Sequence, residues 1–370
     1  MYDVVVIGGG PAGCSTAIHL AREGWSVLLV EESTVPRHKL CGEFLSVEVQ
    51  RMLSRLDLLD TVIDAGAHPI RNALVTTLSE RSYESPLPGT AFGLSRYAFD
   101  QILLKKAEAS RVEVRTGTKV RNVRGNLSDG FVMETGVGSV EARAVVGAFG
   151  KRSVLDRALS RPFIQQNSPY VAFKAHFEGD GVEDRIELHA FDGGYCGLSG
   201  IERGMTNVCW IAHVDRLKRD GGSPDAMLEN SLSSNTKLRR RLAGLLRVSD
   251  SFEAIAQISF EKKGATDGDL FMVGDSAGMI APLCGDGMAM AMHSAELATP
   301  VLSNFLNGRI TAQQAKRAYT DAWERAFSKR LLLGRILHHG YVSPTIAGGA
   351  VRVFRTVPAL GRWVIKKTRG

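Results

Sequence analysis

The segment YDVVVIGGGPAG, residues 2–13, decides the fold of this chain. Residues 4–7 form an unbroken apolar run, which is typical of a central parallel strand that is covered on both faces. Three glycines follow with the G-x-G-x-x-G spacing: Gly8, Gly10 and Gly13. Pro11 stands where a helix would begin, because its missing N–H costs nothing there. The pattern predicts a strand, a tight turn and a helix whose free N–H groups face a pyrophosphate.

A second apolar strand is predicted at residues 27–30, and it ends at Glu31. A carboxylate at this distance from the glycine turn is suited to bind the two hydroxyl groups of a ribose. It would also repel a 2′-phosphate, so an adenosine with a free ribose fits better than NADP. The order of strand, glycine turn, helix, strand and acid therefore favours a dinucleotide site over a glycine-rich turn without a ligand.

The composition is that of a soluble globular protein, with 44% hydrophobic and 23% charged residues among 370. No apolar stretch reaches the length of a membrane span, and the chain starts directly with a strand instead of a basic leader. The five cysteines lack the spacing of a zinc site or a C-x-x-C pair: Cys14, Cys41, Cys196, Cys209 and Cys284. We therefore expect reduced thiols, a cytoplasmic location and no metal.

The end of the chain is strongly basic, which contributes to a net charge of +7. Residues 351–370 contain no acid and six basic residues: Arg352, Arg355, Arg362, Lys366, Lys367 and Arg369. Apolar residues are interleaved with them, and no nucleic-acid motif accompanies them, so we expect no nucleic-acid partner. The segment suits either a helical tail that packs on its own domain or peripheral contact with the inner face of an anionic membrane.

The pattern of strands predicts an α/β fold with one domain inserted into another. Alternating segments at residues 162–264 are typical of antiparallel strands, whereas residues 269–278 return to the pattern of a buried parallel strand. The expected parts are a discontinuous nucleotide-binding domain at residues 1–161 and 265–310, a substrate domain at 162–264 with a contribution from 68–95, and a helical region at 311–370 that includes the basic tail.

Five motifs in sequence order resemble one family of proteins. They are Gly8-x-Gly10-x-x-Gly13 with Glu31, Pro36-Arg37-x-Lys39-x-Cys41-Gly42-Glu43, Arg96 with Asp100, Gly147-Ala-Phe-Gly150-Lys-Arg-Ser153, and Gly274-Asp275-Ser-Ala-Gly278 followed by Pro282-x-x-Gly285-Asp-Gly287. Over residues 1 to 310, the chain is similar to flavin-dependent oxidoreductases of the geranylgeranyl-reductase type. These are related to aromatic-hydroxylase flavoprotein monooxygenases and flavin-dependent halogenases. The resemblance implies a Rossmann-like FAD-binding domain, an inserted antiparallel β-sheet domain and a helical C-terminus.

The same resemblance implies which residues bind FAD. The expected cofactor-binding residues are Gly8, Gly10, Pro11, Ala12, Gly13, Glu31, Glu32, Arg37, Cys41, Gly42, Arg96, Val120, Gly274, Asp275, Gly285, Gly287 and Met288. The glycine-rich turn before residue 288 opens a helix, whose positive end would favour reduction of a flavin beside it. Hydroxylases carry an Asp-Gly pair where this chain has Phe149-Gly150, so the electron donor is left open between NAD(P)H and another reductant.

Three residues are candidates for catalysis. Cys41 is either a thiol that contacts a flavin-bound intermediate or a small residue that fits beside a flat ring. Glu43 is either a proton donor or a backbone hydrogen-bond partner, and Tyr195 lies on a strand of the substrate domain. Of the Tyr-x-Trp-x-Phe-Pro strand that lipid reductases carry, this chain has only the tyrosine. The tryptophan-and-proline motif of halogenases is absent from this chain.

The expected function is that of an FAD-dependent oxidoreductase that acts on a small lipophilic, polyketide-like or isoprenoid-like substrate. It would transfer hydride from flavin N5 or hydroxylate through a C4a-hydroperoxide, which needs a dry cavity. The alternative is a flavin-binding redox sensor or binding protein without catalysis. The oligomeric state is left open.

Overall fold

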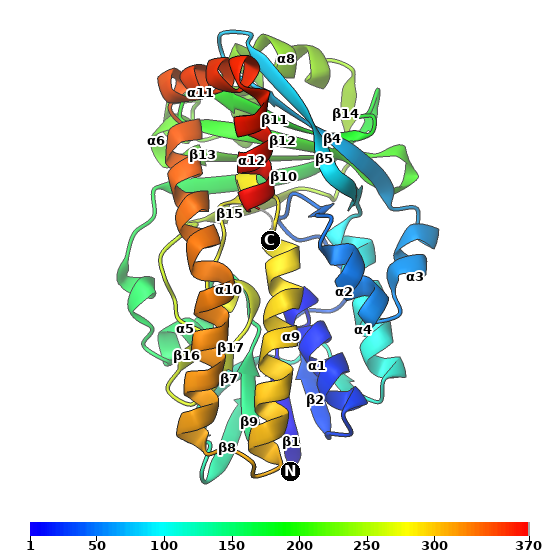
Figure 1. Ribbon diagram of the computed structural model, residues 1–370, viewed down its shortest axis with the longest axis vertical. Coiled ribbons are helices and arrows are strands. Elements are labelled where there is room, and N and C mark those ends of the chain that lie inside the picture. The colour runs from blue at the N-terminus through cyan, green and yellow to red at the C-terminus, as the bar shows by residue number, and fades with distance from the viewer. Residues whose placement is uncertain (369–370) are drawn as a thin grey trace.

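The computed structural model describes residues 1–368 and confirms the predicted α/β fold, which is built on two sheets (Figure 1). The N-terminal sheet occupies the lower half of the view in Figure 1, and the second sheet occupies the upper half. Arg369 of the predicted basic tail lies outside the described residues.

Among residues 1–368, the N-terminal sheet has eight strands, and the central one is β1 (Tyr2–Ile7). It pairs in parallel with β2 (Val27–Val30) on one side and β9 (Gly138–Gly147) on the other. The helices α1 (Pro11–Arg22) and α9 (Gly287–Leu306) lie side by side beside it. Because Val4, Val5 and Val6 have no exposed surface, the strand is apolar without alternation, as a strand covered on both faces requires.

The other strands of this sheet come from distant parts of the sequence. They are β6 (Glu113–Arg115), β7 (Val120–Asn126), β8 (Gly130–Thr135), β16 (Thr266–Asp267) and β17 (Leu270–Met272). β17 pairs in parallel with β9, with Phe271 beside Val146. The chain therefore returns to the N-terminal sheet at β16 and β17, after it has passed through all the described strands of the second sheet.

Within the described residues, the second sheet has nine strands, in the order β14-β10-β13-β12-β11-β4-β5-β3 with β15 beside β10. Their bounds are β3 (Phe44–Leu45), β4 (His68–Thr76), β5 (Ser82–Gly93), β10 (Tyr170–Gly179), β11 (Arg185–Phe191), β12 (Gly194–Gly200), β13 (Thr206–His213), β14 (Leu245–Arg247) and β15 (Glu253–Ala256). Neighbours pair antiparallel except β4 and β11, which run parallel.

Alternation along β10 separates an outer core from an inner face. Phe173 and Phe177 join the outer core, which contains Met227 and Leu238 from two helices that cover this face. Lys174, between the two phenylalanines, points to the opposite, inner face. The helices on the outer side are α6 (Val214–Arg219), α7 (Pro224–Glu229) and α8 (Thr236–Leu242).

Several shorter helices complete the two halves. The remaining helices of the first 310 residues are α2 (Val49–Arg55), α3 (Leu59–Asp64), α4 (Arg96–Ala109) and α5 (Val154–Ala158). The 3₁₀ segments are η1 (Pro162–Gln165), η2 (Glu202–Gly204), η3 (Leu232–Ser234), η4 (Gly274–Ser276) and η5 (Pro282–Cys284).

The long helix α10 (Ala312–Tyr341) runs beside both halves of the molecule (Figure 1). Near its start, Trp323 and Phe327 belong to the core of the N-terminal half. At its end, the Tyr341 hydroxyl lies 2.8 Å from the carbonyl oxygen of Leu188 in the second sheet. Two further helices follow, α11 (Pro344–Thr356) and α12 (Pro358–Thr368). The helix thereby ties the two halves together.

His338 is fully buried near the end of α10, with its ring against those of Tyr170, Phe260 and Tyr195, whose centroids lie 4.6, 4.7 and 5.8 Å away. Within residues 1–368, neither of its ring nitrogens has a hydrogen-bond partner. Burial, with a smaller contribution from His339, lowers the pKa of His338 to about 4 from an ordinary 6.5. The neutral ring is therefore the form that the folded protein holds.

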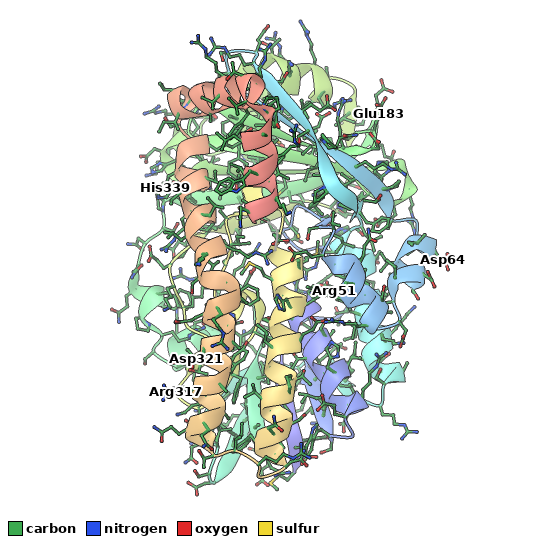
Figure 2. All side chains as sticks on the ribbon, viewed as in Figure 1. Arg51, Asp64, Glu183, Arg317, Asp321 and His339 are labelled. Atoms are coloured by element: carbon green, nitrogen blue, oxygen red, sulfur yellow. The ribbon has the colours of Figure 1, made fainter. Side chains whose placement is uncertain are left out.

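We predict that His338 makes the fold sensitive to mild acid. Its stabilising contribution is complete above pH 6.5 and is lost as the pH falls through 4, because only the unfolded chain takes up the proton in that range. The loss is about 3 kcal/mol of unfolding free energy. Urea unfolding across this range should show a shallower decline for His338→Phe. The control His339→Phe, on the exposed side of α10 (Figure 2), should keep the steep decline, and equal slopes for all three proteins would contradict the prediction.

Candidate functional site

A cavity of about 790 Å³ extends from the glycine turn after β1 to the inner face of the second sheet. Most residues that were expected to bind the cofactor line it: Gly8, Gly10, Pro11, Ala12, Glu31, Glu32, Arg37, Cys41, Gly42, Arg96, Val120, Asp275, Gly285, Gly287 and Met288. The catalytic candidates Glu43 and Tyr195 line it as well. Segments that are far apart in the sequence thus meet around one cavity.

Gly13 and Gly274 lie behind the wall of this cavity instead of in it. A Cβ on Gly13 would lie 1.8 Å from the carbonyl oxygen of Gly8, which is far inside van der Waals contact. Gly274 has φ +61°, and its Cβ would lie 2.8 Å from that of Ala12. Both glycines therefore permit the close packing that shapes the cavity.

The space beside Gly10 is suited to a doubly charged anion. A Cβ on Gly10 would lie 3.5 Å from Arg96 Nη2 and 3.9 Å from Lys39 Nζ, so two cations face the missing side chain. No side chain caps the start of α1, which leaves its first N–H groups for a ligand. These features fit the pyrophosphate of a dinucleotide. Lys39 was not among the expected contacts, although it lies in the motif at residues 36–43.

Arg96 is held in place by a bidentate ion pair with Asp100, one helical turn further along α4. Its Nε and Nη2 lie 2.7 Å from the two oxygens of the buried Asp100 carboxylate. Burial opposes the charge of Arg96, but Asp100 outweighs it and raises the pKa of the guanidinium above its ordinary value. Arg96 is thus a fixed cation that is aimed at the glycine turn.

Glu31 holds the glycine turn against the end of β2. Its carboxylate accepts hydrogen bonds from the N–H groups of Gly9 (2.7 Å) and Ser33 (3.1 Å) and pairs with Arg37 at 3.1 Å. Burial would raise the pKa of Glu31, but Lys39 and the two N–H groups outweigh it and keep the pKa below its ordinary value. This bracing of the turn is a role that the sequence did not indicate.

Glu43 lies at the centre of a buried charged cluster between the two halves. Its fully buried carboxylate lies 2.8 Å from Lys174 Nζ and 2.6 Å from His176 Nε2, both on β10, and accepts the Arg96 N–H at 2.9 Å. Burial would raise the pKa of Glu43, but His176 and Lys174 outweigh it and lower the pKa. Glu43 is therefore an ionised anchor with its oxygens in use. Sequence reasoning missed Lys174. The only feature of the sequence that could have pointed to it is that a lysine occupies an inward-facing position of an alternating strand.

The neighbouring residues are fixed to the second sheet through their backbone. The carbonyl oxygen of Cys41 accepts a hydrogen bond from Asn207 (3.1 Å), and that of Gly42 accepts one from Ser199 (3.0 Å). The Cys41 sulfur accepts a hydrogen bond from the Glu43 N–H at 3.4 Å, and the residue lines the cavity. Strands β12 and β13 thus position the Cys41-Gly42 segment, which the resemblance places beside the flavin.

Tyr195 connects the second sheet to the turn before α9. Its hydroxyl accepts the N–H of Leu283 at 2.9 Å, and burial raises the pKa of Tyr195 well above its ordinary value. The phenol is therefore held as a neutral positioning group. The sequence placed Tyr195 on a strand but did not indicate this contact.

Two more side chains hold the same turn, one through a buried ion pair and the other through a hydrogen bond. Arg330 of α10 pairs with Asp286, and Ser46 donates to the other carboxylate oxygen at 2.8 Å. Asp286 directly precedes α9, whose first residues Gly287 and Met288 line the cavity. Sequence reasoning missed Arg330, because a basic residue on a long mixed helix carries no special signal.

The chain belongs to the FAD binding domain family, which matches residues 1–328. It is 27% identical over 338 residues to a menaquinone reductase of Mycolicibacterium smegmatis, covering 87% of this chain and 79% of the relative. It is 26% identical over 343 residues to digeranylgeranylglycerophospholipid reductase 2 of Methanopyrus kandleri, covering 89% and 83%. The solved structure of the flavin-dependent brominase Bmp2 has the same fold, with a TM-score of 0.81 and 21% identity over 99% of this chain and 93% of that one. The protein is an FAD-dependent enzyme.

We predict that Gly13→Val yields protein without FAD. A Cβ alone at this position would collide with Gly8, so the helix and the glycine turn must separate and the pyrophosphate cradle opens. The absorbance of flavin per mole of purified protein measures the outcome. The control Gly136→Val, at an exposed hairpin position with no atom near its Cβ, should stay yellow. A yellow, stoichiometric Gly13→Val protein would refute the assignment of this cradle.

We predict that Glu43→Gln destabilises the protein by about 3 kcal/mol, since the buried ammonium of Lys174 loses its counter-ion. The Glu43 contribution is present above pH 4.5 and is lost as the pH falls through its lower folded pKa, so the variant should also lack this acid-dependent loss. Denaturant unfolding measures both effects. The double variant Glu43→Gln/Lys174→Met should recover part of the stability, and strictly additive losses would count against the pair.

Proposed function

We propose that this enzyme reduces a carbon–carbon double bond of a lipophilic, isoprenoid-like substrate. The observation that carries the proposal is the apolar lining of the cavity at the second sheet, beyond the segment at residues 41–43. The lining side chains there include Ala172, Ile186, Leu188, Ile211, Ile255 and Met279. An apolar wall of this kind stabilises hydrocarbon by removing it from water. Two relatives that are named as reductases of menaquinone and of a digeranylgeranyl lipid support the same substrate class.

Two parts of the cavity support binding of the pyrophosphate and the isoalloxazine ring of FAD. The cations Lys39 and Arg96 and the start of α1 would hold the pyrophosphate, and the start of α9 would face the isoalloxazine ring. When bound, FAD supplies a hydride from N5 of its reduced form. The N–H groups at the start of α9 lack a side-chain cap, so their positive field would favour the anionic reduced ring.

The turn before α9 owes its position to three separate elements. Tyr195 of β12, Ser46 beside β3 and Arg330 of α10 each contact it. A turn that is fixed in this way would hold a flavin ring in a constant position relative to the apolar chamber, as hydride transfer requires. These contacts support a positioning role for Tyr195 instead of a role as acid.

Reduction of a double bond needs a proton as well as a hydride, and Glu253 is the group that we assign to this step. Glu253 lines the cavity from β15 and forms no ion pair among residues 1–368. Burial raises the pKa of Glu253, against the opposing effect of Lys174. Glu253 would give its carboxyl proton to the carbon of the double bond that does not receive the hydride, and solvent would return a proton to the partly exposed carboxylate.

The proposal is tested with FAD reduced chemically in the absence of oxygen. Mixing with a geranylgeranyl lipid or with menaquinone should reoxidise the flavin and yield the saturated or reduced product in equal amount. If substrate is consumed only after oxygen is admitted and gains an oxygen atom, the enzyme is a monooxygenase and the proposal fails. The physiological electron donor, NAD(P)H or another reductant, does not enter this experiment.

We predict that Glu253→Gln slows substrate-dependent reoxidation about 100-fold, since general acid catalysis typically contributes this much. The flavin content should not change, because Glu253 lines the cavity from β15 of the second sheet and is not part of the glycine turn or the start of α9. Rapid-mixing absorbance measures the rate, and Glu261→Gln, on the exposed segment that follows β15, is the control. An unaltered rate in Glu253→Gln would remove this residue from the mechanism.

A further inference from the structure

The charge of this chain is divided sharply along the sequence. Ten of the 46 lysines and arginines follow Glu324, whereas none of the 39 acids do. The last 46 residues therefore carry ten positive charges, and the first 324 residues have a net charge of −3. The basic character of the protein, a net charge of +7, comes entirely from α10, α11 and α12 and the two residues after them.

The same segment exposes an unusual amount of apolar surface. Seven large apolar side chains after Glu324 are between 39% and 61% exposed: Leu332, Ile336, Ile346, Val353, Val357, Leu360 and Trp363. Exposed Trp363 is the most informative, because tryptophan on a basic amphipathic helix is typical of a lipid interface. Apolar and basic side chains are thus mixed on one part of the surface.

Only one side of α11 and of α12 packs on the rest of the protein, and it is the side opposite these exposed apolar residues. Ala347 and Val351 of α11 are buried, and Ile365 of α12 packs on the cluster that contains Phe44 and Ile70. A Cβ on Gly361 would lie 2.5 Å from the Tyr83 ring, so α12 approaches β5 closely. The helices are therefore firmly seated, and their exposed sides are left for another contact.

We call the exposed side of α11 and α12 the C-terminal basic surface, and it consists of Arg352, Val353, Arg355, Val357, Leu360, Arg362, Trp363, Lys366 and Lys367. Within residues 1–368, none of its five basic side chains forms an ion pair. The contrast with the start of α10 is visible in Figure 2, where Arg317 is followed one turn later by Asp321, while His339 marks the acid-free end.

We infer that the C-terminal basic surface binds the surface of an anionic lipid bilayer. Basic side chains are attracted to acidic lipid headgroups, and valine, leucine and tryptophan side chains enter the boundary between headgroups and acyl chains. No helix among residues 1–368 has the length and apolarity needed to pass through a bilayer, so the contact is peripheral. A purely acidic protein partner would leave the apolar half of the surface unexplained.

The position of this surface connects it to the chamber, if the proposed function holds. Ile365 of α12 packs on the cluster that contains Phe44 and Ile186, and these two residues also line the cavity. An enzyme bound through α11 and α12 would therefore hold the apolar wall of its chamber close to the lipid from which its substrate comes.

The experiment is co-sedimentation of the FAD-loaded, full-length protein with vesicles. Phosphatidylcholine vesicles are compared with vesicles that also contain phosphatidylglycerol, and the second kind should bind the protein much more tightly. Arg352→Glu/Arg362→Glu/Lys366→Glu should weaken binding to the anionic vesicles at least about 100-fold. Val357→Ser/Trp363→Ser, which keeps every charge, should weaken binding about tenfold.

The matched control is Lys105→Glu/Arg121→Glu/Arg309→Glu, which makes the same change in net charge at exposed positions outside the C-terminal basic surface. It should bind anionic vesicles like the unaltered protein. Equal binding to both kinds of vesicle, no binding to either, or an equal loss in the control would overturn the inference. Flavin absorbance verifies that each variant is folded, and reoxidation by substrate dissolved in detergent tests the proposed function separately, so that either idea can fail alone.

Discussion

The structure depends on one buried carboxylate between its two halves. Glu43 belongs to the motif at residues 36–43, which follows β2, and its oxygens contact Lys174 and His176 of the second sheet and the N–H of Arg96 at the start of α4. A buried charge without partners would be very costly, so these groups must remain together in the folded protein. The cluster joins the two halves beside the cavity, which Glu43 lines.

The two ends of the cavity are suited to different chemical groups. Its N-terminal end carries cations and free N–H groups that suit a pyrophosphate, whereas its far end is lined by aliphatic side chains, which under the proposed function would face a hydrocarbon. The turn before α9 lies between them, and Tyr195, Ser46 and Arg330 hold it from different elements. Because Arg330 lies on α10, this C-terminal helix helps to position the site.

Much of the fold could be predicted because its signals are local. The apolar run at residues 4–7, the spacing of Gly8, Gly10 and Gly13 and the acid Glu31 depend only on neighbours along the chain, and they indicated the parallel sheet and the dinucleotide site. Long-range contacts leave weaker signals. Lys174 and Arg330 looked like ordinary basic residues of a strand and a helix, and only the fold places a carboxylate beside each of them.

The sequence by itself determined the class of this protein. Strand periodicity and glycine spacing are properties of short segments that indicate a dinucleotide site, and five motifs in sequence order resemble one family of flavoproteins. Tertiary structure decided the roles of Glu43 and Tyr195. Their sequence positions made both residues candidates for catalysis. In the fold, Glu43 is an ionised anchor, and Tyr195 is a neutral support for the turn before α9. The reason is physical: burial and partner charges set the protonation and the freedom of a side chain, and both depend on which distant residues the fold brings within a few ångströms.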